Sequence, residues 1–251
     1  MNERAAAALP AVVAAAPLLA LSALAKAVAA RFAAPPMSES ENEDTSATED
    51  APEKQPSNGR LRIEKETIAA LPLRQYTGSI ILVEDPEDTP AAVARLAKER
   101  VLGFDTESRP SFHAGTTYLP SLIQLAGENA VWLFRLDACG GVPPLFPILR
   151  NPKILKVGVA VRDDIRGLQD RAPFKDGGFV EISTFTRRAG IENTGLKALA
   201  AHYLGLRISK GAQVTNWANR RLTPQQITYA ATDAWVSREL YLAIEKQGLT
   251  E

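Results

Sequence analysis

Cysteine and aromatic residues are scarce in this sequence of 251 residues, which contains one cysteine and 6% aromatic residues. The single cysteine, Cys139, excludes an internal disulfide bond and a metal site made of several thiolates. One free thiol fits a reducing compartment, so we expect a cytoplasmic protein. The shares of hydrophobic residues, 45%, and charged residues, 23%, are typical of a globular protein, and the length allows one substantial domain with a tail.

A net charge is also lacking, because 29 basic and 29 acidic residues balance over the whole chain. The two signs are nevertheless unevenly distributed. Residues 1–36 hold three basic residues against one acidic residue, and residues 37–57 hold seven acidic residues against Lys54 alone. Residues 58–251 therefore carry a net charge of +4, which indicates a mildly basic domain behind an acidic segment.

Acidic residues are absent between Thr194 and Thr232 in the sequence. Five basic residues lie in this acid-free stretch: Lys197, Arg207, Lys210, Arg220 and Arg221. A stretch that attracts phosphates and repels none suits a polyanionic partner such as a nucleic acid. Charge alone equally allows a solvated surface whose counter-charges lie elsewhere in the fold.

The alanine-rich run from Ala5 to Ala25 allows three interpretations. It is long enough for a membrane helix, yet Pro10 and Pro17 would interrupt its hydrogen bonds. It has a possible signal-peptide cleavage site at Ala23–Ala25, although its opening residues are not clearly basic. We favour the third interpretation, in which translation starts at Met37 or the run is an inert extension.

Residues 38–59 contain almost no apolar side chains. Such a segment cannot bury enough surface to offset the entropy lost on ordering, so we expect it to be disordered. The predicted organisation is an alanine-rich extension with an acidic disordered tail over residues 1–60, and one folded domain over residues 61–251.

Hydrophobic periodicity predicts the elements of this domain. The expected strands span residues 79–83, 101–104, 122–126, 130–134, 154–159 and 179–182, and the expected helices span 90–97, 163 onward, 194–204 and 224–246. Thr223, Pro224 and Gln226 form the capping-box pattern of a helix start. Strands joined by a hairpin, followed by alternating helices and strands, indicate an α/β fold with a mixed sheet.

Candidate catalytic residues share faces of these elements. Asp105 and Glu107 stand two residues apart at the end of a strand, so both carboxylates project from one face. Tyr229 and Asp233 stand four residues apart on the last helix, which places them one turn from each other. Asp164 lies at the start of another helix. Taken singly, each feature also has an ordinary explanation as a solvated strand end, a core-and-rim pair or a helix cap.

Together these residues resemble the DEDD superfamily of 3′–5′ exonucleases, in the subclass whose last motif carries tyrosine. Three motifs occur in the family's order: Phe104–Glu107 (FDTE), Lys156–Asp164 (KVGVAVRDD) with Leu168, and Tyr229–Asp233 (YAATD). Ser121–Leu125 and Thr215–Trp217 are also similar to family segments. The resemblance covers about residues 75–246 and is greatest to the Werner-type exonuclease domain and its bacterial relatives, with RNase D more distant.

The resemblance implies an RNase H-like mixed sheet, with antiparallel first strands and then parallel strands, flanked by helices. It also implies two divalent cations, Mg²⁺ or Mn²⁺, which prefer carboxylate oxygens. Asp105 would bridge both cations. Glu107 and Asp233 would help to hold one of them, and Asp164 would support the other. Tyr229 would orient the attacking water.

Two departures from the family pattern concern substrate contacts more than chemistry. Ser108 and Arg109 stand where Werner-type domains usually carry Trp-x-Pro. Asp163 adds an acid beside the second motif, in which the spacing from Gly158 selects Asp164.

The expected partner is a single-stranded or 3′-ended nucleic acid, with DNA favoured. We expect no membrane partner, and the sequence indicates no protein partner. Arg109 follows Glu107 by two residues and could hold a phosphate of the terminal nucleotide bidentately. The further predicted nucleic-acid-binding residues are Lys210, Asn216, Trp217, Arg220 and Arg221.

Three other functions stay open at this point. The same chemistry could act on RNA, as in an RNase D-like processing enzyme. The domain could also be a catalytically silent nucleic-acid-binding module. The least favoured alternative is a phosphomonoesterase with Asp105 as its nucleophile.

Overall fold

A computed structural model describes residues 61–111, 113 and 117–250. All of them belong to the unit Gln55–Glu251. The predictions for the alanine-rich run and the acidic tail concern residues 1–60 and lie outside the described residues. Within the described ranges, none of the helices has the length and apolar character needed to cross a membrane.

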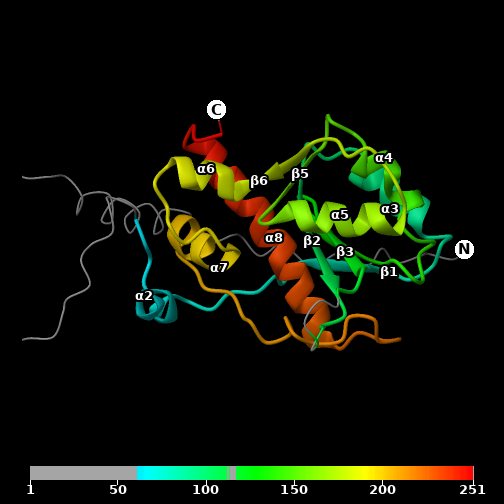
Figure 1. Cartoon of the computed structure of the whole chain (residues 1–251), viewed down its shortest axis with the longest axis horizontal. Coiled ribbons are helices and arrows are strands. Elements are labelled where there is room, and N and C mark those ends of the chain that lie inside the picture. Colours follow the sequence, from blue (N-terminus) through cyan, green and yellow to red (C-terminus); the bar gives the residue numbers. More distant parts are fainter. Residues whose placement is uncertain (1–60, 112, 114–116, 251) are drawn as a thin grey trace, which may run out of the picture. The chain divides into compact units, whose positions relative to one another are not determined.

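A six-stranded mixed sheet forms the centre of the domain (Figure 1). Its strands are β1 Ser79–Val83, β2 Val101–Ser108, β3 Pro120–Ala126, β4 Ala130–Arg135, β5 Leu155–Gly158 and β6 Phe179–Glu181, in the order β1-β4-β3-β2-β5-β6. β3 pairs antiparallel with β2 and β4, whereas β1 with β4, β2 with β5, and β5 with β6 are parallel pairs. The predicted mixed sheet is confirmed, and all six predicted strands are present.

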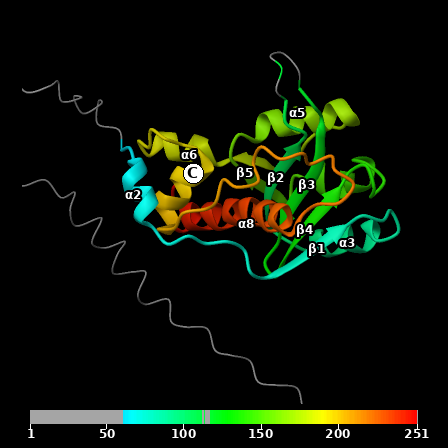
Figure 2. The same ribbon diagram turned by 90° about the horizontal axis from the view of Figure 1, so that it is seen from below.

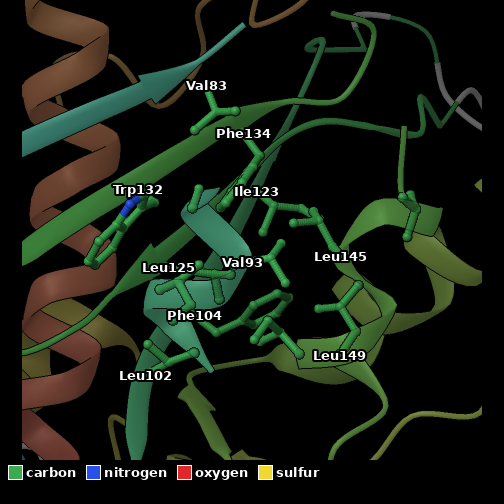
Figure 3. Close-up of a cluster of buried hydrophobic side chains, with 14 of the residues drawn as sticks. Val83, Val93, Leu102, Phe104, Ile123, Leu125, Trp132, Phe134, Leu145 and Leu149 are labelled. Carbon is green, nitrogen blue, oxygen red and sulfur yellow. The ribbon is translucent and has the colours of Figure 1, made fainter. Parts of the chain in front are cut away.

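Helices cover both faces of this sheet. The helical elements of the described chain are α2 Lys65–Ala70, α3 Thr89–Leu96, the short turn η1 Pro143–Leu145, α4 Phe146–Leu149, α5 Val161–Arg171, α6 Ile182–Arg188, α7 Leu196–Leu199, the π-helical turn η2 Ala200–Leu204, and α8 Pro224–Lys246. Of these, α2 has no buried residue and lies apart from the sheet (Figure 1). The apolar cluster in Figure 3 joins α3, α4 and α5 to one face of the sheet through residues such as Phe104 and Leu125. Two further clusters join α7 and α8 to the other face.

The last helix, α8, begins and ends where the sequence predicts. Thr223 accepts a hydrogen bond from the Gln226 backbone N–H at 3.2 Å, and the Gln226 side chain accepts one from the Thr223 N–H at 2.9 Å. The capping box therefore satisfies two N–H groups that the helix start would leave unpaired. From this start α8 crosses four strands, β2 to β5 (Figure 2).

Strand β2 is longer than expected. The sequence suggested that it would end at Asp105, but it continues to Ser108 because β3 pairs with it along this length. Asp105 lies opposite Gln124 and Glu107 opposite Leu122. Both acids are therefore held by a paired strand, on the same face as Gly103, which packs against α8.

The approach of β2 to α8 depends on Gly103. A Cβ atom at this position would lie 1.9 Å from the backbone oxygen of Ala234. Real Cβ atoms do not approach so closely, so glycine is required for α8 to lie against β2 at this point. Because Asp233 precedes Ala234, this contact also determines how near Asp233 lies to Asp105.

Replacement of Gly103 by alanine is expected to destabilise the domain. The added methyl group meets a backbone atom that cannot rotate away, so we expect a loss of about 2–3 kcal/mol, the upper part of the range for overpacked cores. Urea unfolding measures this loss. Gly195→Ala is the matched control, because a Cβ there meets no atom within 4 Å. Equal stability of the two variants would contradict the proposed role of Gly103.

Candidate active site

Four acids from three elements come together at the end of β2. Asp105 and Glu107 lie on β2, Asp164 on α5 and Asp233 on α8. Asp233 is only 5% exposed, and the other three are half-buried. The Thr106 hydroxyl donates a hydrogen bond to Oδ1 of Asp164 at 2.5 Å and so ties α5 to β2.

The electrostatics of these acids show that they resist joint ionisation. Burial, and then repulsion from Asp164, Asp233 and Glu107, raises the pKa of Asp105 well above its ordinary value. Burial and the same two aspartates, Asp233 and Asp164, raise the pKa of Glu107 to about 9. Burial also raises the pKa values of Asp164 and Asp233, each to about 6. A cation among them would relieve this repulsion.

Tyr229 lies one turn before Asp233 on α8 and is buried beside it. Burial, and then the Asp233 carboxylate, raises the pKa of the Tyr229 phenol. The phenol therefore remains protonated and able to donate a hydrogen bond at neutral pH. The ring of Trp217 packs against it, with 6.0 Å between the ring centroids.

Lys197 of α7 brings a positive charge close to Asp233. Its Nζ atom is buried and has no hydrogen-bond partner among the described residues, and the same holds for Oδ1 of Asp233. Lys197 opposes the rise that burial causes in the pKa of Asp233. In the sequence, Lys197 is one of the five basic residues of the acid-free stretch. No sequence signal distinguishes it there, because its place beside Asp233 results from the packing of α7 on α8.

The donor set suits a hard divalent cation, since carboxylate oxygens are the ligands such cations prefer. The unpartnered Oδ1 of Asp233 offers one such oxygen. In their present positions, however, no three His, Cys, Asp or Glu side chains in the described part of the chain are arranged to hold a metal ion. The residues fit the cation chemically, and holding it would require their side chains to turn toward a common point.

The predicted nucleic-acid-binding residues are dispersed. Lys210, Arg220 and Arg221 are exposed on the segment before α8. Arg109 is exposed at the end of β2, with its guanidinium 4.9 Å from the centre of the Tyr118 ring.

Trp217 and Asn216 each have a structural role in the loop before α8. Trp217 is only 1% exposed and belongs to the apolar cluster under α8, so its ring has no surface to offer to a nucleic acid. Asn216 uses its side-chain oxygen to accept a hydrogen bond from the Ala218 N–H at 3.0 Å, which stabilises a local turn. Asn216 thus stabilises a turn in the loop before α8, and the Trp217 ring packs against the Tyr229 ring.

The domain is similar in sequence to 3′–5′ exonucleases. The model of a 3′–5′ exonuclease family matches residues 80–248, which include the four acids and Tyr229. Ribonuclease D of Haemophilus influenzae is 31% identical over 195 residues, which are 76% of this chain and 46% of that protein. The bifunctional 3′–5′ exonuclease/ATP-dependent helicase WRN of Mus musculus is 30% identical over 190 residues, 72% of this chain and 14% of that protein. The chain thus spans less than half of the length of these relatives. The motifs suggested that RNase D is the more distant relative, but the two sequence identities are nearly equal and give no support to that ranking.

Solved structures share the fold. The EXO domain of Aedes aegypti Nibbler aligns with a TM-score of 0.62 and 27% identity, over 71% of this chain and 92% of that chain. Escherichia coli RNase D aligns with a TM-score of 0.59 and 22% identity, over 68% of this chain and 47% of that chain, which supports the fold alone. The RNase H-like architecture expected from the motifs is confirmed by these neighbours. The chain belongs to the 3′–5′ exonuclease family.

Proposed function

We propose that this chain hydrolyses the terminal phosphodiester bond at nucleic-acid 3′ ends, with two divalent cations, Mg²⁺ or Mn²⁺, held by four carboxylates. These are Asp105, Glu107, Asp164 and Asp233. The observation that carries the proposal is the clustering of these acids, whose burial raises the pKa of every one of them. Bound cations would stabilise the ionised carboxylates. The exonuclease family generally depends on divalent metals, in agreement with this assignment.

The surrounding residues support the same chemistry. Two bound cations would supply a nucleophile from water and stabilise the leaving oxygen. The protonated Tyr229 phenol orients the attacking water by a hydrogen bond, as in the tyrosine subclass that the third motif resembles. Trp217 limits the movement of that phenol by packing against its ring. The buried ammonium of Lys197 attracts the negative phosphate toward the four acids.

We propose a single-stranded or 3′-ended nucleic acid in the cytoplasm as the substrate, with DNA favoured on the resemblance to Werner-type domains. RNA is the second candidate. It is favoured by the relatives named Ribonuclease D and by the similar fold of Trypanosoma brucei RNase D, whose structure was solved with the RNA U12.

Stepwise shortening of 3′ ends is the first expected outcome. The purified protein should produce a ladder from end-labelled DNA in Mg²⁺ or Mn²⁺, and excess EDTA should stop the reaction by removing the charge partners of the acids. Matched DNA and RNA strands of one sequence should be compared in the same assay. A ladder that persists in EDTA would contradict the metal requirement, and faster degradation of RNA would reverse the preference for DNA. Binding without degradation would indicate a silent module.

The two neighbouring acids of the second motif should differ in effect. Asp164 is half-buried and accepts the Thr106 hydrogen bond, whereas Asp163 is exposed. Asp164→Asn should therefore lower kcat on the order of 100-fold or more, the range seen when one group that stabilises a transition state is lost. Asp163→Asn is the control and should keep most of the activity. The reverse ranking, measured with equally stable variants, would show that Asp163 is the ligand.

A further inference from the structure

A cavity of about 790 Å³ lies where the N-terminus of α5 and the end of β6 meet α6 and the start of α7. Figure 2 shows α5 and α6 on either side of β5 at this end of the sheet. The volume lies toward the upper end of the range for ligand sites, about 300–1,000 Å³. The cavity can therefore hold a ligand much larger than a single ion.

Three arginines from two helices line this cavity: Arg162, Arg166 and Arg187. Arg162 and Arg166 are exposed, stand one turn apart on α5, and form no ion pair with any described residue. Residues at this spacing have Cβ atoms about 5–6 Å apart, so the two guanidinium groups can reach different anionic groups of one ligand. Arg187 of α6 donates a hydrogen bond to the Thr194 hydroxyl at 3.4 Å.

The two acids of the lining already accept hydrogen bonds from the protein. Glu181 accepts the Val161 N–H at 3.0 Å and the Ser183 N–H at 3.1 Å. Asp176 accepts a hydrogen bond from the Gln169 side chain at 3.2 Å. Both carboxylates therefore stabilise the segments that line the cavity. Because the lining contains three arginines and two acids, the cavity favours an anionic ligand.

The cavity lies near one of the four acids, Asp164, which is not part of its lining. Asp164 lies between Arg162 and Arg166 in the sequence but on another face of α5. Glu181 of the cavity wall is near enough to Asp164 to repel it. Val159 and Ala160 of the lining connect β5 to α5. At the end of β5, a Cβ atom on Gly158 would touch the backbone oxygen of Phe104, the residue before Asp105.

We propose that this cavity binds the backbone phosphates that lie upstream of the 3′-terminal nucleotide in a single strand, an inference that rests on the proposed function. Arg162 and Arg166 hold successive phosphates, since guanidinium groups bind phosphate oxygens bidentately. Phe179 is the single aromatic residue among the described residues of the lining, and it is half-buried. The site therefore recognises backbone charge rather than bases, which suits an enzyme that removes any nucleotide.

This path differs from the one predicted from the acid-free stretch. Lys210, Arg220 and Arg221 lie on the segment before α8, and none of them lines the cavity among the described residues. The acid-free stretch lines a second cavity of about 370 Å³, which includes Tyr229 and Asp233. Arg74 is the one cation among its described lining residues, so the three arginines favour the larger cavity as the path of the strand.

The test compares Arg162→Gln/Arg166→Gln with Arg95→Gln, which changes an exposed arginine on the distant helix α3. Hydrolysis is measured on a dinucleotide, which has no upstream phosphate, and on a longer single strand of the same sequence. The double variant should lose on the order of tenfold in kcat/KM on the long strand and much less on the dinucleotide. In EDTA, its binding to the long strand should show a salt slope smaller by about 1.4, which corresponds to two lost phosphate contacts.

The possible outcomes separate the two proposals. Hydrolysis by the wild-type protein, with an unchanged salt slope in the double variant, would overturn the inference while leaving the proposed function standing. Equal losses on both substrates would also overturn it, because the arginines would then act on the four acids or on the fold. Absence of metal-dependent hydrolysis by the wild-type protein would overturn the proposed function itself. Equal thermal unfolding of the variants excludes a folding defect as the cause.

Discussion

The removal of four neighbouring carboxyl groups from water, with repulsion around Asp105 and Glu107, is the constraint on which the rest of this domain depends. Acids brought from β2, α5 and α8 into one another's field cannot all ionise without compensation. The packing of α8 and α5 against β2 holds these acids close together. Gly103 lets α8 lie against β2, and the Thr106 hydroxyl ties Asp164 to the same strand. The folded chain is therefore destabilised when these carboxyl groups ionise, and a bound divalent cation would offset this loss of stability.

Much of this arrangement could be predicted from the sequence, because it depends on local rules. The capping box at Thr223 sets the start of α8, and the position of Tyr229 relative to Asp233 then follows from the helical repeat. The helix expected over residues 194–204 stops at Gly205, which takes a left-handed conformation with φ of 64° at the end of η2. Alternation along β2 likewise placed Asp105 and Glu107 on one face.

The features that could not be predicted depend on contacts between distant segments. Strand β2 continues past Asp105 because β3 pairs with it, although the residues after Asp105 are polar. Trp217 looked available to a ligand, but it completes the apolar cluster under α8. Lys197 was one of several cations in the sequence, and only the packing of α7 on α8 brings it beside Asp233. The short helices α2, α4 and α6 contain too few residues for a periodic signal.

Stability measured with and without a divalent cation tests the central claim most directly. Folding raises the pKa values of Asp164 and Asp233 to about 6 and of Glu107 to about 9, so the folded chain binds more protons than the unfolded chain above about pH 4. In EDTA, the free energy of unfolding should therefore be lower at about pH 8 than at about pH 5, with a smaller difference in Glu107→Gln. Mg²⁺ should restore stability at the higher pH, where the acids ionise. A free energy of unfolding at about pH 8 that Mg²⁺ leaves unchanged would contradict the account.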